Sequence, residues 1–145
     1  MTGPTRTGPD HLAPDDSALA LRVVTMPKDT NQYGTVFGGV ILSYIDQAGF
    51  VQARRHGCHR WVTASMQTVD FKAPVIVGDT VSFYTRTVRT GTKSVTVAVD
   101  VVAERYASDD CAAVTSAELT MVAVDAHGQP IPFSSAPTVF ETGVN

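Results

Sequence analysis

A single carboxylate, Asp46, lies in the middle of the most apolar stretch of the sequence, residues 36–53. On a helix its neighbours lie three and four positions away, and none of these residues is basic. The stretch predicts a helix buried on most sides, so Asp46 is expected to be a buried carboxylate without a charged partner, which costs stability. A protein keeps such a group for a polar network or as a general base or nucleophile, and we favour the second hypothesis.

Two glycines, Gly38 and Gly39, stand at the start of this predicted helix. Glycines there let a ligand approach the free backbone N–H groups that carry the positive end of the helix dipole. This arrangement could stabilise an oxyanion, although a tight turn would also explain the pair. Asn31, further upstream in D-T-N-Q-Y-G, is either a turn residue or a polar group directed at a substrate or a water molecule.

The spacing of Gly39 and Asp46 puts them on the same face of a helix but about 10 Å apart along its axis. An attacking group and an oxyanion donor must both lie about 3 Å from the reacting atom. If both residues act in one site, they therefore come from two helices. An antiparallel helix in a two-fold dimer would supply the second one.

Other chemistries have little support in the sequence. It lacks the G-x-S-x-G of α/β-hydrolases, the dinucleotide-binding G-x-G-x-x-G and the P-loop. His56, Cys58 and His59, in H-G-C-H, belong to metal-ligating types. No second cluster completes a tetrahedral set, so we interpret them as a loop at the helix end and predict no metal site.

The elements that must position these residues are one long helix and several strands. Long β-branched runs with partial alternation predict strands at residues 18–25, 61–71, 80–88, 94–106 and 112–124. Two of the turn segments between the last four strands are too short for parallel crossovers, so we expect these strands to form an antiparallel meander. The sequence therefore predicts an α+β fold in which a curved antiparallel sheet wraps around the helix. Dimerisation would cover the remaining helix face and the sheet edges.

Length and composition restrict the function classes. The 145-residue chain is expected to form one domain, residues 18–133, between a disordered tail at residues 1–17 and a C-terminal tail at residues 134–145. A net charge of −3 with thinly spread Lys and Arg disfavours a nucleic-acid partner. The start of the sequence lacks a signal-peptide pattern, the helix is too short and polar to span a membrane, and the two cysteines form no C-x-x-C motif. We therefore expect a cytoplasmic protein.

Three motifs resemble those of the hotdog-fold acyl-CoA thioesterases: D-T-N-Q-Y-G-T-V-F-G-G-V-I-L-S-Y-I-D-Q-A-G, V-D-F-K-A-P-V-I-V-G-D and T-G-T-K-S-V. They occur in the family's order, and the resemblance covers about residues 20–133, in the branch of bacterial hydrolases related to the cytosolic brain-type enzyme. It implies a hotdog fold, in which a five- or six-stranded antiparallel sheet wraps a long central helix. It also implies a homodimer that often assembles into a hexamer, as a trimer of dimers.

The resemblance implies roles for individual residues. Asp46 matches the family's catalytic aspartate, and Asn31 matches an asparagine that meets this aspartate across the dimer interface. The N–H of Gly39 would donate to the thioester oxygen. Contacts to coenzyme A would come from Thr92, Lys93, Ser94 and Arg60, with Arg54 and Arg55 as further candidates.

The predicted function is hydrolysis of acyl-CoA to a free carboxylic acid and coenzyme A, without a cofactor. Asp46 would activate water as a general base or attack the thioester directly. The alternative is a non-catalytic acyl-CoA-binding or sensor module on the same fold. A hotdog dehydratase is disfavoured, because that group uses a histidine near the helix and none lies within it before His56.

Overall fold

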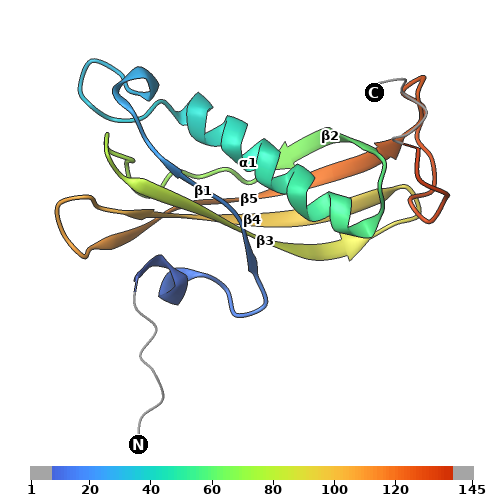
Figure 1. Ribbon diagram of the computed structural model, residues 1–145, viewed down its shortest axis with the longest axis horizontal. Coiled ribbons are helices and arrows are strands. Elements are labelled where there is room, and N and C mark those ends of the chain that lie inside the picture. Colours follow the sequence, from blue (N-terminus) through green and yellow to red (C-terminus); the bar gives the residue numbers. More distant parts are fainter. Residues whose placement is uncertain (1–7, 139–145) are drawn as a thin grey trace, which may run out of the picture.

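One antiparallel sheet of five strands forms the frame of the protein in the computed structural model, which describes residues 8–138 (Figure 1). In chain order the strands are β1 (Ala18–Val24), β2 (Arg60–Gln67), β3 (Thr80–Thr90), β4 (Ser94–Glu104) and β5 (Cys111–Val124). Their order across the sheet is β1-β3-β4-β5-β2, so β1 and β2 are its edges. All four neighbouring pairs are antiparallel, which confirms the predicted direction of pairing. The predicted meander holds for β3, β4 and β5 but is wrong for β2, which pairs with β5 and not with β3.

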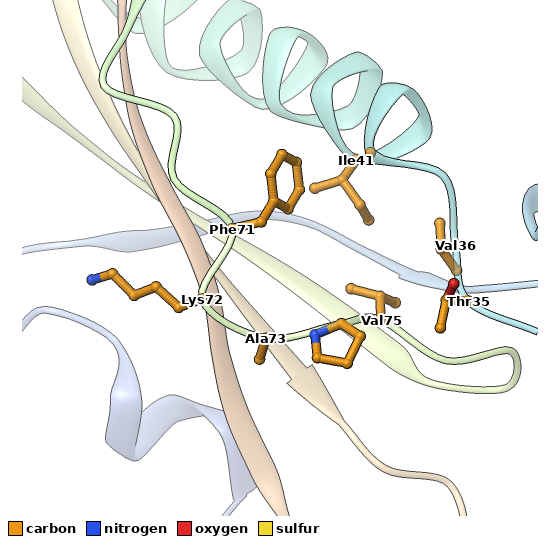
Figure 2. Close-up of a pocket in the computed structure, with 9 residues that line it drawn as sticks. Thr35, Val36, Ile41, Phe71, Lys72, Ala73 and Val75 are labelled. Atoms are coloured by element: carbon orange, nitrogen blue, oxygen red, sulfur yellow. The ribbon is translucent and has the colours of Figure 1, made fainter.

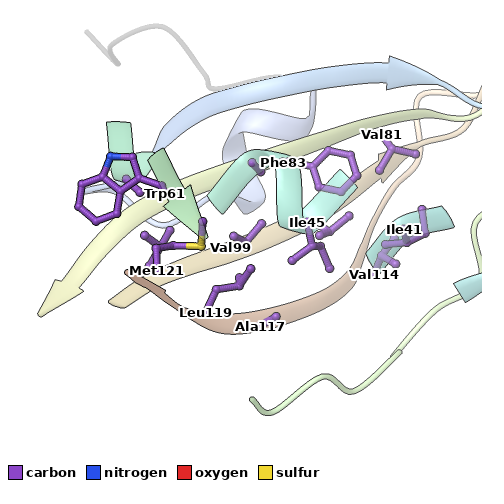
Figure 3. Close-up of a cluster of buried hydrophobic side chains, with 14 of the residues drawn as sticks. Ile41, Ile45, Trp61, Val81, Phe83, Val99, Val114, Ala117, Leu119 and Met121 are labelled. Carbon is purple, nitrogen blue, oxygen red and sulfur yellow. The ribbon is translucent and has the colours of Figure 1, made fainter. Parts of the chain in front are cut away.

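The long helix α1 (Gly38–Ala53) lies across one face of the sheet (Figure 1). Its residues Ile41 and Ile45 are at most 1% exposed, and Figure 3 shows them among sheet side chains that include Phe83 and Leu119. Burying a large apolar side chain of this kind contributes roughly 1.5–3 kcal/mol, so this contact fixes the helix on the sheet. The predicted α+β class is confirmed. Within residues 8–138, no helix has the length and apolar character needed to cross a membrane.

Strand β2 is shorter than predicted. The sequence pattern suggested a strand through residue 71, but β2 ends at Gln67. Thr68 has a φ of 55°, which is incompatible with an extended strand. The regular pairing of β2 ends there, although the N–H of Lys72 still donates to the carbonyl of Val114 on β5 at 2.7 Å, and the next strand, β3, begins at Thr80.

The segments predicted as tails contribute contacts where the structure describes them. Residues 8–12 form a short 3-10 helix, η1, which packs on the sheet face opposite α1 and buries Pro9 (Figure 1). Asp10 in η1 accepts hydrogen bonds from Arg22 and from the Tyr84 hydroxyl. Residues 134–138 also contact the body of the protein, as described below. Residues 1–7 and 139–145 lie outside the described residues.

An ion pair between Asp79 and Arg105 lies at one end of the sheet. Asp79 is 2% exposed and accepts a hydrogen bond from Arg105, the residue that follows β4. The Asp79 carboxylate also accepts a hydrogen bond from the N–H of Ile76 at 2.8 Å. Arg105 donates in addition to the carbonyl of Pro74 at 3.1 Å. The pair thus ties the loop before β3 to the residue that follows β4.

Candidate active site

Asp46 lies beside the edge strand β2 and has one polar partner there. The hydroxyl of Thr63 on β2 donates a hydrogen bond to Asp46 Oδ1. Thr63 stands where the pairing of β2 with β5 is irregular, between Thr63 and Ser65. Such irregularities redirect a side chain relative to the regular ladder. The contact engages one carboxylate oxygen, and the other has no hydrogen-bond partner among residues 8–138.

The prediction that Asp46 is buried is wrong for the single chain, in which its side chain is exposed. The sheet covers the helix face that carries Ile41 and Ile45, but it ends at β2. The neighbouring face, with Asp46, Gln47 and Phe50, is therefore left uncovered. The sequence pattern did not show this, because a helix that is apolar nearly all round has no clear outer face.

An open groove of about 630 Å³ surrounds the Asp46 carboxylate. Its lining is mostly apolar and comes from α1, β1, β2 and β5: Leu21, Asp46, Gln47, Phe50, Val51, Trp61, Val62, Thr63 and Met121. A groove with apolar walls and one oriented carboxylate has the features expected of a small-molecule site.

The start of α1 offers open backbone donors. The first N–H groups of a helix have no acceptor within it, and Phe37, the residue that caps α1, supplies no side-chain hydrogen bond. Gly39 is exposed, and a Cβ built on it would meet no atom within 4 Å. The space beside this backbone is therefore open enough for a ligand oxygen to approach it.

A second, smaller hollow of about 310 Å³ lies beside Gly38. Its walls include Val36, Ile41, Phe71 and Val75. Figure 2 shows the ring of Phe71 pointing toward the start of α1, whereas Lys72 points away. The hollow gives the helix start an apolar neighbourhood.

Asn31 shapes the loop that leads into α1. Its Oδ1 accepts the N–H groups of Tyr33 at 2.9 Å and Thr35 at 3.2 Å, and its Nδ2 donates to Thr35 Oγ1 at 2.7 Å. The structure therefore shows the turn role. Of the two N–H bonds on Nδ2, one is used in this contact within residues 8–138, so the amide retains a donor.

Gly39 and Asp46 do not meet within one chain. Both lie on α1, which runs without a break from Gly38 to Ala53, so about 10 Å of helix rise separates them. Asn31 precedes the helix and lies on the Gly39 side. Within the single chain the candidate residues therefore form two separate groups, one at the start of α1 and the other around Asp46 and Thr63, which we call the two candidate half-sites.

The residues predicted to contact coenzyme A gather at the end of the sheet where α1 finishes. Residues 92–93 form the turn between β3 and β4, Ser94 begins β4, and Arg60 begins β2. The register places Ser94 opposite Val122 and Arg60 opposite Val124, on the two sides of β5. His56 Nε2 lies in hydrogen-bond contact with Thr87 Oγ1, near the end of β3, at 2.8 Å, and this contact joins the end of α1 to the same region. The basic residues there are Arg54, Arg55, Arg60, Arg89 and Lys93.

The two histidines of the H-G-C-H segment take part in hydrogen bonds. The His56 ring bonds Thr87, and both ring nitrogens of His59 are used in hydrogen bonds. Among residues 8–138, no three His, Cys, Asp or Glu side chains lie close enough to hold a metal ion together. The interpretation of the H-G-C-H segment as a loop at the helix end agrees with the hydrogen bonds of His56 and His59.

Two residues of the site were missed by sequence reasoning. Thr63, the partner of Asp46, and Trp61, in the groove wall, both come from β2. The only sequence signal is that both stand in a predicted strand at alternate positions, which places them on one face of the sheet.

Comparisons with known proteins agree with this architecture. The sequence profile of the thioesterase superfamily matches residues 33–107. The acyl-CoA thioester hydrolase YciA of Escherichia coli is 38% identical over 115 residues, which cover 77% of this chain and 87% of YciA.

Two solved structures illustrate the likeness in three dimensions. Cj0915, a hexameric hotdog fold thioesterase of Campylobacter jejuni, has 44% identity and a TM-score of 0.77, with 83% of this chain and 92% of that chain covered. HI0827, a hexameric broad specificity acyl-coenzyme A thioesterase, has 32% identity and a TM-score of 0.79, with 87% of both chains covered. This chain belongs to the thioesterase superfamily and has the hotdog fold.

Proposed function

We propose that this protein hydrolyses acyl-CoA thioesters to a carboxylic acid and coenzyme A. The observation that carries the proposal is the Asp46 carboxylate, oriented by Thr63 in a groove with mostly apolar walls. The names of relatives such as YciA and HI0827 support the same substrate class. No cofactor is needed, because coenzyme A enters as part of the substrate.

In this mechanism Asp46 acts through the carboxylate oxygen that Thr63 does not hold. As a general base it takes a proton from water, whose oxygen attacks the thioester carbon. The C–S bond then breaks, and the proton passes to the leaving sulfur. As a nucleophile it would instead form an anhydride that water hydrolyses. A single turnover in ¹⁸O-labelled water can reveal the anhydride, since label found in Asp46 requires water to have attacked the Asp46 carbon of the anhydride, whereas label confined to the product acid fits both routes.

The oxyanion donor is the N–H of Gly39 from a second subunit, with Asn31 of that subunit positioning the water or the carbonyl. Gly39 is too far along α1 to serve the Asp46 of its own chain. An antiparallel pair of helices in a two-fold dimer would bring the two half-sites together. Hexameric relatives support a further assembly of three such dimers.

Coenzyme A would lie along the basic end of the molecule. Thr92 and Lys93 are exposed in the turn there, with Ser94 and Arg60 nearby. Cationic side chains near phosphates form charge-assisted hydrogen bonds, which suits the phosphates of coenzyme A. Cys58 and Cys111 are both free thiols, which fits a reducing compartment, and we propose the cytoplasm.

The test is thiol release from acyl-CoA by Asp46→Ala, with Gln47→Ala as the matched control in the same groove. We expect Asp46→Ala to lose turnover without losing the dimer, as judged by light scattering, while the control stays active. Near-normal turnover by Asp46→Ala would overturn the assignment. Tight binding of acyl-CoA by the wild type without release of coenzyme A would instead identify a binding or sensor module.

A further inference from the structure

The segment after β5 returns across the end of the sheet, and we call residues 131–138 the strap. Its backbone N–H groups donate to three other parts of the chain: Ile131 to Ala123 (2.9 Å), Phe133 to Thr92 (3.2 Å) and Thr138 to Cys58 (3.2 Å). The strap therefore joins the end of β5, the turn before β4 and the loop before β2.

His59 holds the strap from inside. The side chain is 2% exposed, and its Nε2 lies 2.8 Å from the carbonyl oxygen of Phe133, while Nδ1 lies 3.1 Å from Thr138 Oγ1. A carbonyl oxygen can only accept, so Nε2 carries a proton, and Nδ1 can accept from the threonine hydroxyl. Both partners of this buried ring are strap residues. The strap therefore satisfies both nitrogens of a buried ring, and a buried ring that lost these hydrogen bonds would be costly.

Gly57 permits the close approach between His59 and the strap. A Cβ built on Gly57 would lie 2.8 Å from the His59 ring and 2.9 Å from the carbonyl oxygen of Phe133. Any larger residue would push the ring or the strap backbone away. The glycine and the histidine of H-G-C-H thus form one contact with the strap.

Trp61 connects this contact with the wall of the groove around Asp46, because it packs against His59 and Phe133 and also lines the groove. The Trp61 ring meets the ring of His59 edge-on, with centroids 6.2 Å apart, and lies against Phe133 at 6.0 Å. Its Nε1 donates to the carbonyl of Gly57 at 2.9 Å. Trp61 also lines the groove around Asp46, and Figure 3 shows it next to Met121, another wall residue. The strap side of Trp61 is therefore packed, and its groove side faces the site.

We propose that the strap, latched by His59, fixes Trp61 in the groove wall and the Thr92 turn at the coenzyme A end, so that His59 is a positioning residue for substrate binding. This inference rests on the proposed hydrolase function. The hydrogen bonds and the ring contact of His59 go to Phe133, Thr138 and Trp61 and not to Asp46 or Thr63, so its effect is expected on substrate binding and not on the chemical step.

The test compares His59→Phe, which keeps a ring but loses both hydrogen bonds, with His59→Gln, which can still donate to the Phe133 carbonyl. Trp61 is the single tryptophan of the chain, so its fluorescence reports the groove wall directly. For the full chain we would measure kcat and KM with acyl-CoA, the emission of the free enzyme, and a fluorescence titration with free coenzyme A.

His59→Phe is expected to shift the Trp61 emission to the red and to raise KM about five- to tenfold, as fits the loss of one or two hydrogen bonds. Its kcat should stay within about twofold, because Asp46 and Thr63 are untouched. His59→Gln should restore most of the KM. A folded His59→Phe with unchanged KM and emission, or with a loss confined to kcat, would overturn the proposal.

The proposal can still be tested if His59→Phe does not fold or if the wild type releases no thiol. If His59→Phe does not fold, Thr138→Val removes the Nδ1 partner alone, and a KM raised about two- to threefold with shifted emission would support the latch. Unchanged values in Thr138→Val would then contradict it. If the wild type releases no thiol from any acyl-CoA, the hydrolase proposal fails, whereas the emission of His59→Phe still tests the latch.

Discussion

Replacing Gly39 with proline would remove one N–H from the first turn of α1 while leaving the fold intact. A Cβ at Gly39 meets no atom within 4 Å, and proline is tolerated in the first helical turn because the N–H there has no intrahelical acceptor. Gly39→Ala is the matched control, since it adds the Cβ and keeps the donor. We would pair Gly39→Pro with Asp46→Asn, which removes the base from the other half-site.

The expected magnitudes follow from the two half-sites. Loss of one oxyanion donor lowers kcat by about 10²–10³, and loss of the Asp46 carboxylate should cost at least as much. In a mixed dimer of the two variants, one site carries both substitutions and the other carries neither. Random pairing makes about half of the dimers mixed, each with one intact site of two, so about a quarter of wild-type activity should return.

The assay is thiol release after the two purified variants are mixed, dissociated in mild denaturant and reassociated. Co-expression with two different affinity tags would isolate the mixed dimer, which should show about half of wild-type activity. If Gly39 and Asp46 instead act within one chain, both sites of the mixed dimer are defective. Failure of activity to return would then refute the reasoning, provided that Gly39→Ala remains active.

Three further substitutions each test the role of one side chain. Thr63→Val keeps the side-chain shape but removes the donor to Asp46, and kcat should fall about 10- to 100-fold without a large change in melting temperature. Asp79→Ala leaves Arg105 without its buried partner and should lower the free energy of unfolding by roughly 3–5 kcal/mol in a denaturant titration. Burial raises the pKa of Asp100 above its ordinary value of 3.8, so its charge destabilises the folded state at neutral pH. Asp100→Asn should therefore melt higher at pH 7, and this gain should disappear as the pH falls below about 4.

The arrangement of the elements was predictable to the extent that local patterns carry it. The apolar run predicted a helix over residues 36–53, and α1 occupies Gly38–Ala53. Alternating β-branched residues likewise predicted five strands, and the structure has them in one antiparallel sheet. The position of β2 beside β5 was not predictable, because β3 and β4 lie between these two strands in the chain and nothing local records that pairing.

Of the candidate site, only the chemically unusual members could be chosen from the sequence. Asp46 and Gly39 stand out because a carboxylate in an apolar run and a glycine pair at a helix start are rare in themselves. Thr63 and His59 do not stand out, since each acquires its contact from the fold. The hydrogen bond from Thr63 spans seventeen positions, and those of His59 reach more than seventy positions along the chain. Such contacts depend on register and on the path of the strap, which composition does not encode.

The exposure of Asp46 strengthens the argument for a dimer. In the single chain the groove is open, and the edge strand β2 presents Val62, 45% exposed, while α1 presents Phe50, 41% exposed. A carboxylate in contact with bulk water is a weak catalyst, because solvent screens every charge that develops during the reaction. A second subunit over this face would exclude water, cover the apolar side chains and bring the missing N–H donor of Gly39. One interface would thus satisfy the packing of the fold and the chemistry of the site together.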